Sequence, residues 1–79
     1  MTEKEWLVRF SKKLRDAMEE KGYTQAELAK VSRVSQATVS AYLRASKIPG
    51  VRAILNISYA LDIPVDELTD LGGRIEYFL

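Results

Sequence analysis

The chain has 79 residues, a hydrophobic content of 47% and a net charge of +1, which together describe one small domain with enough apolar side chains for a compact core. It contains no cysteine and no histidine, which excludes disulfides, thiolate chemistry, most zinc sites and the usual general base. No apolar run approaches the roughly 18 residues of a membrane span, and residues 1–5 lack the apolar stretch of a signal peptide, so we expect a cytoplasmic protein that does not bind membranes.

The first predicted helix covers residues 3–21 and carries one apolar stripe. Its apolar residues recur at steps of three and four, the spacing of a single helix face: Trp6, Phe10, Leu14, Ala17 and Met18. Gly22 follows, and glycine commonly ends a helix. We therefore expect the stripe to pack into the core and the helix to stop at Gly22.

Two short helices are predicted next, at residues 25–31 and 36–44, with a connection of about four residues between them. Thr24 and Glu27 form a capping box for the first of the pair, and Ser35 caps the second. The side chains expected to point inward are Leu28, Ala29, Val39, Tyr42 and Leu43. The side chains expected on one outward face of residues 36–44 are Gln36, Ala37, Ser40, Ala41 and Arg44.

A loop at residues 45–50 is expected to lead into a fourth helix at 51–61 and, after Pro64, a short fifth helix at 65–70 with Leu68 inward. The residues expected near the buried side of the fourth helix are Ile54, Leu55, Ile57, Ser58 and Leu61. The fold class is therefore all-α, with one domain at residues 1–71. Residues 72–79 form a separate apolar tail whose partial alternation weakly indicates a strand.

Basic residues are concentrated in the middle of the chain. Residues 23–50 carry four basic side chains and one acidic one, a net of +3, whereas residues 51–79 have a net charge of −3. A polyanion would dock on the positive segment. An imbalance of this size also arises by chance in small domains, so charge alone does not decide the function.

Two glutamines eleven residues apart, Gln25 and Gln36, each follow a capping hydroxyl and open one of the paired helices. Such a pair of short helices is the layout of a DNA-reading helix-turn-helix. The Gln36 amide can pair with the edge of adenine, and Ala37 and Ala41 are small enough to meet a thymine methyl group. The start of the helix at Gln25 can hold a phosphate.

Other polar residues complete the candidate DNA-binding set. Ser40 could bond to a base edge or a phosphate, and any contact from Ser35 would be secondary to its role as a cap. Arg33, Arg44 and Lys47 flank the proposed reading face and would supply salt-dependent affinity. Taken singly, each of these residues has an ordinary explanation as a cap, a helix former or a solubilising charge. Only their joint arrangement favours DNA.

Enzyme chemistry finds little support in the sequence. Neighbouring Asp66 and Glu67 would point about 100° apart on a helix, so they do not form an acid–base pair. The acidic residues Asp62, Asp66, Glu67 and Asp70 lack the spacing and glycine of an EF-hand, and a solvated acidic face explains them better. We expect no catalytic residue, no metal site and no cofactor.

The motif Thr24-Gln25-x-Glu27-Leu28-Ala29, followed by Ser32-x-Val34-Ser35-Gln36-x-Thr38-Val39-Ser40-x-Tyr42, resembles the phage Cro/C1-type repressor DNA-binding domain, or XRE family. The likeness extends over about residues 8–70. It implies a five-helix fold that binds palindromic operators in double-stranded DNA as a homodimer. It also implies that Gln36, Ala37 and Ala41 face base edges. Gln25, Thr38 and Arg44 would face phosphates or base edges near them.

Three positions depart from the pattern of that family. Arg33 and Ala45 stand where glycine is common, and Leu43 stands where an acidic residue commonly pairs with the first helix. A positive φ at Arg33 would cost on the order of 1 kcal/mol, so either the turn differs or Arg33 tolerates the strain. With alanine at position 45, the loop at residues 44–50 is expected to differ in path from that typical of the family.

The leading hypothesis is a sequence-specific transcriptional regulator. The alternatives are a protein-interaction adaptor or antirepressor, or the antitoxin of a toxin–antitoxin pair, with a protein partner at the apolar C-terminal tail. Dimerisation could use the same tail, which contains Ile75, Tyr77, Phe78 and Leu79. It could instead use residues 50–70, as in many relatives of the resembling family.

Overall fold

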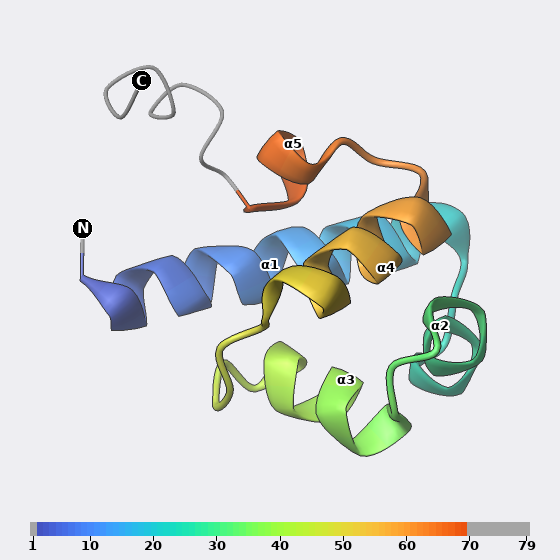
Figure 1. Cartoon of the computed structure of the whole chain (residues 1–79), viewed down its shortest axis with the longest axis horizontal. Coiled ribbons are helices and arrows are strands. Elements are labelled where there is room, and N and C mark those ends of the chain that lie inside the picture. The colour runs from blue at the N-terminus through green and yellow to red at the C-terminus, as the bar shows by residue number, and fades with distance from the viewer. Residues whose placement is uncertain (1, 70–79) are drawn as a thin grey trace.

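The computed structural model describes residues 2–69, and this part of the chain forms five α-helices and no strand (Figure 1). The helices are α1 (Glu3–Lys21), α2 (Gln25–Ser32), α3 (Gln36–Leu43), α4 (Val51–Leu61) and α5 (Val65–Thr69). All five predicted helices are confirmed, and the bounds of α2 and α3 differ from the prediction by one residue. The tail at residues 72–79, its predicted strand and the domain boundary before it lie outside the described residues. Within residues 2–69 no helix has both the length and the apolar character to cross a bilayer.

The helix ends follow from local side-chain chemistry. Thr2 Oγ1 accepts a hydrogen bond of 3.1 Å from the backbone N–H of Glu5 and so caps α1. Gly22 ends α1 in the left-handed conformation with φ 72°, as predicted. The capping box of α2 is also confirmed: Thr24 Oγ1 accepts from Glu27 N at 3.1 Å, and Thr24 N donates to Glu27 Oε1 at 3.0 Å. These caps satisfy N–H groups that the first helical turns leave without partners.

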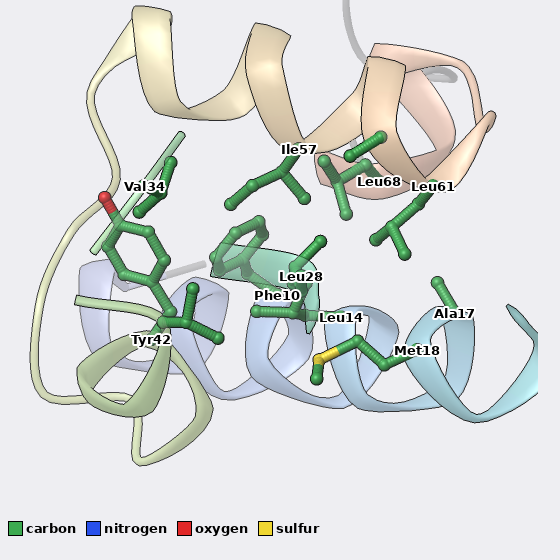
Figure 2. Close-up of a cluster of buried hydrophobic side chains, with 12 residues drawn as sticks. Phe10, Leu14, Ala17, Met18, Leu28, Val34, Tyr42, Ile57, Leu61 and Leu68 are labelled. Carbon is green, nitrogen blue, oxygen red and sulfur yellow. The ribbon is translucent and has the colours of Figure 1, made fainter. Parts of the chain in front are cut away.

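The core lies where α1, α2, α3, α4 and α5 converge (Figure 2). The largest fully buried side chains are Phe10, Leu14, Leu28, Val39, Ile57, Leu61 and Leu68. Trp6 stacks on Phe10 with ring centroids 5.3 Å apart, and Tyr42 meets Phe10 edge to face at 5.9 Å. The aromatic rings of Trp6 and Tyr42 are therefore part of the packing, and Tyr42 is 3% exposed.

The predicted buried side of α4 is partly wrong. Ile57 and Leu61 are buried and Ile54 and Ser58 are half-buried, but Leu55 is 53% exposed. At about 100° per residue, Leu55 lies nearly opposite Ile57 on the helix. An apolar residue at that position cannot share the buried face, whatever its hydropathy.

The paired helices α2 and α3 lie against the rest of the molecule at a sharp angle to each other. In Figure 1, α3 forms one edge of the molecule and α2 is seen nearly end-on, while α1 runs along most of its length. At the other end, Trp6 Nε1 donates a hydrogen bond of 2.7 Å to the carbonyl of Thr69, which joins the start of α1 to the end of α5. Helix α3 packs against α1 and α2, and these contacts hold it at the molecular surface.

Candidate nucleic-acid interface

The turn between α2 and α3 consists of Arg33, Val34 and Ser35 and is held by a buried serine. Ser32 is 2% exposed, and its hydroxyl donates to the Leu28 carbonyl at 2.6 Å and accepts from Val34 N at 3.3 Å. Val34 is itself buried against the core. A turn with both a buried side chain and a buried hydroxyl has little freedom, so the angle between the two helices is well defined.

Arg33 adopts the left-handed conformation in this turn, with φ 59° and ψ 26°. The sequence left open whether the turn would change shape or Arg33 would accept the strain, and the second is what is found. The cost is about 1 kcal/mol for a residue with a Cβ atom. The side chain is exposed, so this conformation places a cation beside the start of α3.

Ser35 caps α3, as predicted. Its Oγ accepts from Thr38 N at 3.1 Å and donates to Thr38 Oγ1 at 2.8 Å. The Ser35 hydroxyl therefore both donates to Thr38 and accepts from it, and Thr38 is half-buried. Both residues are candidates for DNA contact. The hydroxyl hydrogen of Ser35 is used in the bond to Thr38, whereas the hydroxyl hydrogen of Thr38 is available to an acceptor on a ligand.

The outward side of α3 is most exposed at its first turn. Gln36 and Ala37 are exposed, whereas Ser40 and Ala41, one turn later, are half-buried. Val39 and Tyr42 are buried on the opposite side, which fixes the rotation of the helix about its axis. A groove-binding helix presents its N-terminal residues to base edges, and here those residues are the ones that protrude.

Gln25, at the first position of α2, is also exposed. The side chains of Gln25 and Gln36 form no hydrogen bond with each other in the part of the chain that the structure describes. Each amide is therefore free to meet a ligand. The two helix N-termini supply further N–H groups, since the first turn of a helix has donors without intrahelical partners.

The end of α3 is closed by two residues in an irregular conformation. Arg44 is the C-cap, and its Nη1 donates a hydrogen bond of 2.5 Å to Ser40 Oγ. Ala45 adopts the left-handed conformation with φ 55°, so alanine takes here a conformation that glycine favours. Ser46 N and Ser46 Oγ both donate to the Ala41 carbonyl, at 2.9 and 3.1 Å. Lys47 then follows as an exposed cation.

Leu43, the last residue of α3, has no acidic side chain to pair with α1, but its backbone serves that purpose. The Leu43 carbonyl accepts hydrogen bonds from Ser11 Oγ at 2.7 Å and Arg15 Nη2 at 3.1 Å. Sequence reasoning missed both donors, because a bond to a backbone carbonyl 28 or 32 residues away leaves no pattern in the side chains.

The electrostatic character of this surface is positive. Arg33, Arg44 and Lys47 are exposed around α3, and Glu27 is the only acidic residue between positions 23 and 50. The hydrogen bond from the Thr24 backbone lowers the pKa of Glu27, whose carboxylate is thus held at the cap of α2. Among the described residues no group of acidic side chains could hold a metal ion.

A second feature that sequence reasoning missed is an exposed apolar stripe on α4. Val51, Leu55 and Tyr59 recur every four residues and are 75%, 53% and 88% exposed. Val31 of α2, 49% exposed, lines two shallow hollows together with Tyr59. The spacing of the stripe was visible in the sequence as a second apolar face of the helix.

Two short helices set at an angle by a rigid turn, with the second exposed along one edge, define a helix-turn-helix domain of the kind found in DNA-binding regulators. The chain belongs to the helix-turn-helix family HTH_3, of the Cro/C1 type, whose family model matches residues 14–68. The resemblance found in the sequence is thereby confirmed. That family consists of transcriptional regulators.

Similar solved structures agree with this assignment. The restriction-modification controller protein C.AhdI from Aeromonas hydrophila is 34% identical, with a TM-score of 0.76 over 78% of this chain and 94% of that one. An HTH_3 family transcriptional regulator from Vibrio cholerae shares the fold, with a TM-score of 0.81 over 96% of this chain at 14% identity. This chain spans 42% of the length of that protein. None of the curated protein sequences matches the chain.

Proposed function

We propose that this protein is a transcriptional regulator that recognises a palindromic operator in double-stranded DNA as a homodimer, with α3 in the major groove. The observation that carries the proposal is the exposure of Gln36 and Ala37 on the first turn of α3, while Val39 and Tyr42 of the same helix are buried in the core. Its mechanism would be steric, because two copies bound at an operator exclude polymerase.

Base recognition falls to the small and amide side chains of α3. Gln36 can donate to adenine N7 and accept from the adenine N6 amino group as a bidentate pair, which is worth roughly 1–3 kcal/mol of discrimination against other bases. Ala37 and Ala41 allow close approach and suit the methyl group of thymine. The half-buried position of Ala41 fits a residue that limits how deeply α3 enters the groove.

Phosphate binding falls to the residues around that helix. The exposed Gln25 and the N-terminus of α2 can hold one phosphate, as helix N-termini do. Thr38 can donate its free hydroxyl hydrogen to another, since Ser35 already donates to Thr38 Oγ1. The exposed cations Arg33, Arg44 and Lys47 would add salt-dependent affinity, and Ser35 would contribute mainly as a cap.

Dimerisation is most simply assigned to the apolar stripe of α4. Three large side chains exposed in one row are unusual for a surface that stays in water. A second copy bound through the same row would make the self-complementary contact of a two-fold dimer, which matches the symmetry of a palindromic site. The tail at residues 72–79 remains a second candidate for this contact.

Selection of bound duplexes from a random pool tests the proposal directly. We expect enriched sites with two inverted half-sites. Replacing Gln36 by alanine should weaken binding and relax preference at one base pair in each half-site, and Gln36→Glu should shift that preference towards cytosine, whose amino group a carboxylate accepts. Unchanged preference in both variants would remove Gln36 from the reading residues.

A protein-interaction role without DNA binding is the competing function. Even non-specific affinity requires only basic contacts, so a DNA-binding domain should shift random duplexes in a gel at about 50 mM salt. Complete absence of a shift would favour an adaptor, antirepressor or similar partner-binding role. The tail would then be the first segment to delete.

The identity of 34% with a restriction-modification controller protein favours one particular regulatory role, control of a restriction-modification operon. The expected observation is a neighbouring gene for a nuclease or a DNA methyltransferase, with the selected operator in front of it. A neighbouring toxin gene would instead support the antitoxin role.

A further inference from the structure

Ser40 and Arg44 form a bonded pair on the exposed edge of α3. Arg44 Nη1 donates to Ser40 Oγ at 2.5 Å, and Arg44 N donates to the Ser40 carbonyl at 3.1 Å. The side chain of Arg44 therefore folds back by one helical turn, towards the N-terminus of α3, instead of extending into solvent. The bond places the guanidinium beside the helix face that carries the candidate base-reading residues.

The guanidinium retains most of its binding capacity in this position. Arginine has five N–H donors in a planar fork, and the bond to Ser40 uses one of them. Arg44 is exposed and has no carboxylate partner among the described residues. Its remaining donors can approach a phosphate as a bidentate pair, a geometry that guanidinium groups favour.

The bond gives Ser40 an indirect route to DNA. Its Oγ accepts from Arg44, and the residue is half-buried between the first turn of α3 and the C-cap. A hydroxyl in that position can act on DNA through the arginine that it holds, and a double-mutant cycle separates this from a direct contact of its own hydroxyl hydrogen. Because a long side chain loses rotamer freedom when it is immobilised, a partner that fixes it beforehand increases affinity.

We propose that Ser40 is a positioning residue for Arg44, and that the pair binds one phosphate of the operator backbone without reading sequence. The inference rests on the proposed DNA-binding function and deepens it, because it removes Ser40 from the candidate base-reading residues. It assigns Ser40 and Arg44 to affinity and leaves base reading to Gln36, Ala37 and Ala41.

A double-mutant cycle tests the pair. Dissociation constants for the selected operator, for single-base-pair variants and for random duplex would be measured at several salt concentrations for the parent, Ser40→Ala, Arg44→Ala and the double variant. We expect Arg44→Ala to weaken binding roughly tenfold at 0.1 M salt on every duplex and to reduce the salt slope by about 1. Ser40→Ala should weaken binding by about two- to tenfold on every duplex with the base preference unchanged.

The coupling between the two substitutions decides the question. If Ser40 acts through Arg44, Ser40→Ala should have no effect when Arg44 is already alanine, and Ser40→Thr, which keeps the hydroxyl, should retain parental affinity. Lys12→Ala removes a cation from the exposed face of α1 and serves as the charge control, with less than a twofold effect expected.

Two outcomes would overturn the inference while leaving the proposed function intact. They are a changed base preference in Ser40→Ala, and effects of the two substitutions that multiply in the double variant. A parent protein that binds no duplex at low salt would overturn the proposed function and this inference together. Circular dichroism of each variant separates these results from loss of fold.

Discussion

The hydroxyl of Ser11 in α1 donates a hydrogen bond of 2.7 Å to the backbone carbonyl of Leu43, the last residue of α3. Ser11 is 6% exposed, so the bond is sheltered from water. Carbonyl groups in the last turn of a helix lack intrahelical partners, and Arg15 donates to the same carbonyl at 3.1 Å. Two donors from α1 therefore hold the C-terminal end of the helix that we propose enters DNA.

Replacing Ser11 by alanine should lower the free energy of unfolding by about 1 kcal/mol, because the sheltered hydrogen bond is lost while Arg15 still satisfies the carbonyl. Urea denaturation followed by circular dichroism would measure the change. Ser46→Ala is the matched control: its exposed hydroxyl donates to the Ala41 carbonyl at 3.1 Å, and its loss should change stability by less than about 0.5 kcal/mol. Equal effects of the two substitutions would contradict a special role for Ser11.

Replacing Arg33 by glycine should change stability and DNA binding in opposite directions. Removal of the Cβ atom at φ 59° relieves strain, and the free energy of unfolding should rise by up to about 1 kcal/mol. Loss of the cation should weaken binding to all duplexes and reduce the salt slope by about 1. Denaturation and binding titrations on the same variant give both values.

Arg33→Lys is the control for this experiment, because it keeps both the cation and the strained backbone. It should match the parent in stability and nearly match it in salt slope. If Arg33→Gly binds DNA as tightly as the parent, Arg33 is an ordinary surface charge and leaves the proposed phosphate-binding set.

The helices were predictable because the residues that start and end them lie close to those ends in the sequence. Thr24 and Glu27 lie three residues apart, and Gly22 and Ser35 sit at the ends that they close, so each signal can be found within one turn of the chain. The apolar residues Val39 and Tyr42 on one side of α3 also allowed us to predict which side would be exposed. Gln36 and Ala37, on the predicted outward face, are exposed in the structure.

The remaining features depend on choices that local patterns cannot make. Helix α4 is apolar on two faces, and only packing against α1, α2 and α5 decides that Ile57 and not Leu55 is buried. The contact of Ser11 with Leu43 joins a side chain to a distant backbone atom. Ser40 and Arg44 lie four residues apart and so share a helix face, but that spacing alone does not predict a hydrogen bond between a serine and an arginine. The DNA contacts themselves stay predictions.

The capping box of α2 should weaken in acid. The hydrogen bond from the Thr24 backbone lowers the pKa of Glu27 in the folded chain, so the folded state favours the ionised carboxylate more than the unfolded state does. A lowered folded pKa contributes stability above the ordinary pKa of glutamate, and that contribution is lost as the pH falls through the folded value. Stability should therefore fall between about pH 5 and pH 3, partly through this residue.

Glu27→Gln isolates this contribution, because glutamine keeps an acceptor oxygen for Thr24 but does not titrate. The difference in unfolding free energy between the parent and Glu27→Gln should shrink as the pH is lowered over the same range. A difference that stays constant with pH would show that the carboxylate charge contributes nothing at this cap.

The apolar stripe of α4 should control self-association. Leu55→Glu and Tyr59→Glu place a charge on residues that are 53% and 88% exposed, so the fold should tolerate both while a contact between two copies should not. Sedimentation of the parent at increasing concentration should approach the mass of a dimer, and both variants should stay monomeric. Val8→Glu, at a residue of α1 that is 55% exposed, is the matched control and should associate like the parent. If the α4 variants still dimerise and a chain that ends at residue 72 does not, the contact belongs to the tail. In either case the variants that are monomeric should bind the operator more weakly than the parent. The loss should be largest at low protein concentration, where two half-sites can no longer be filled together.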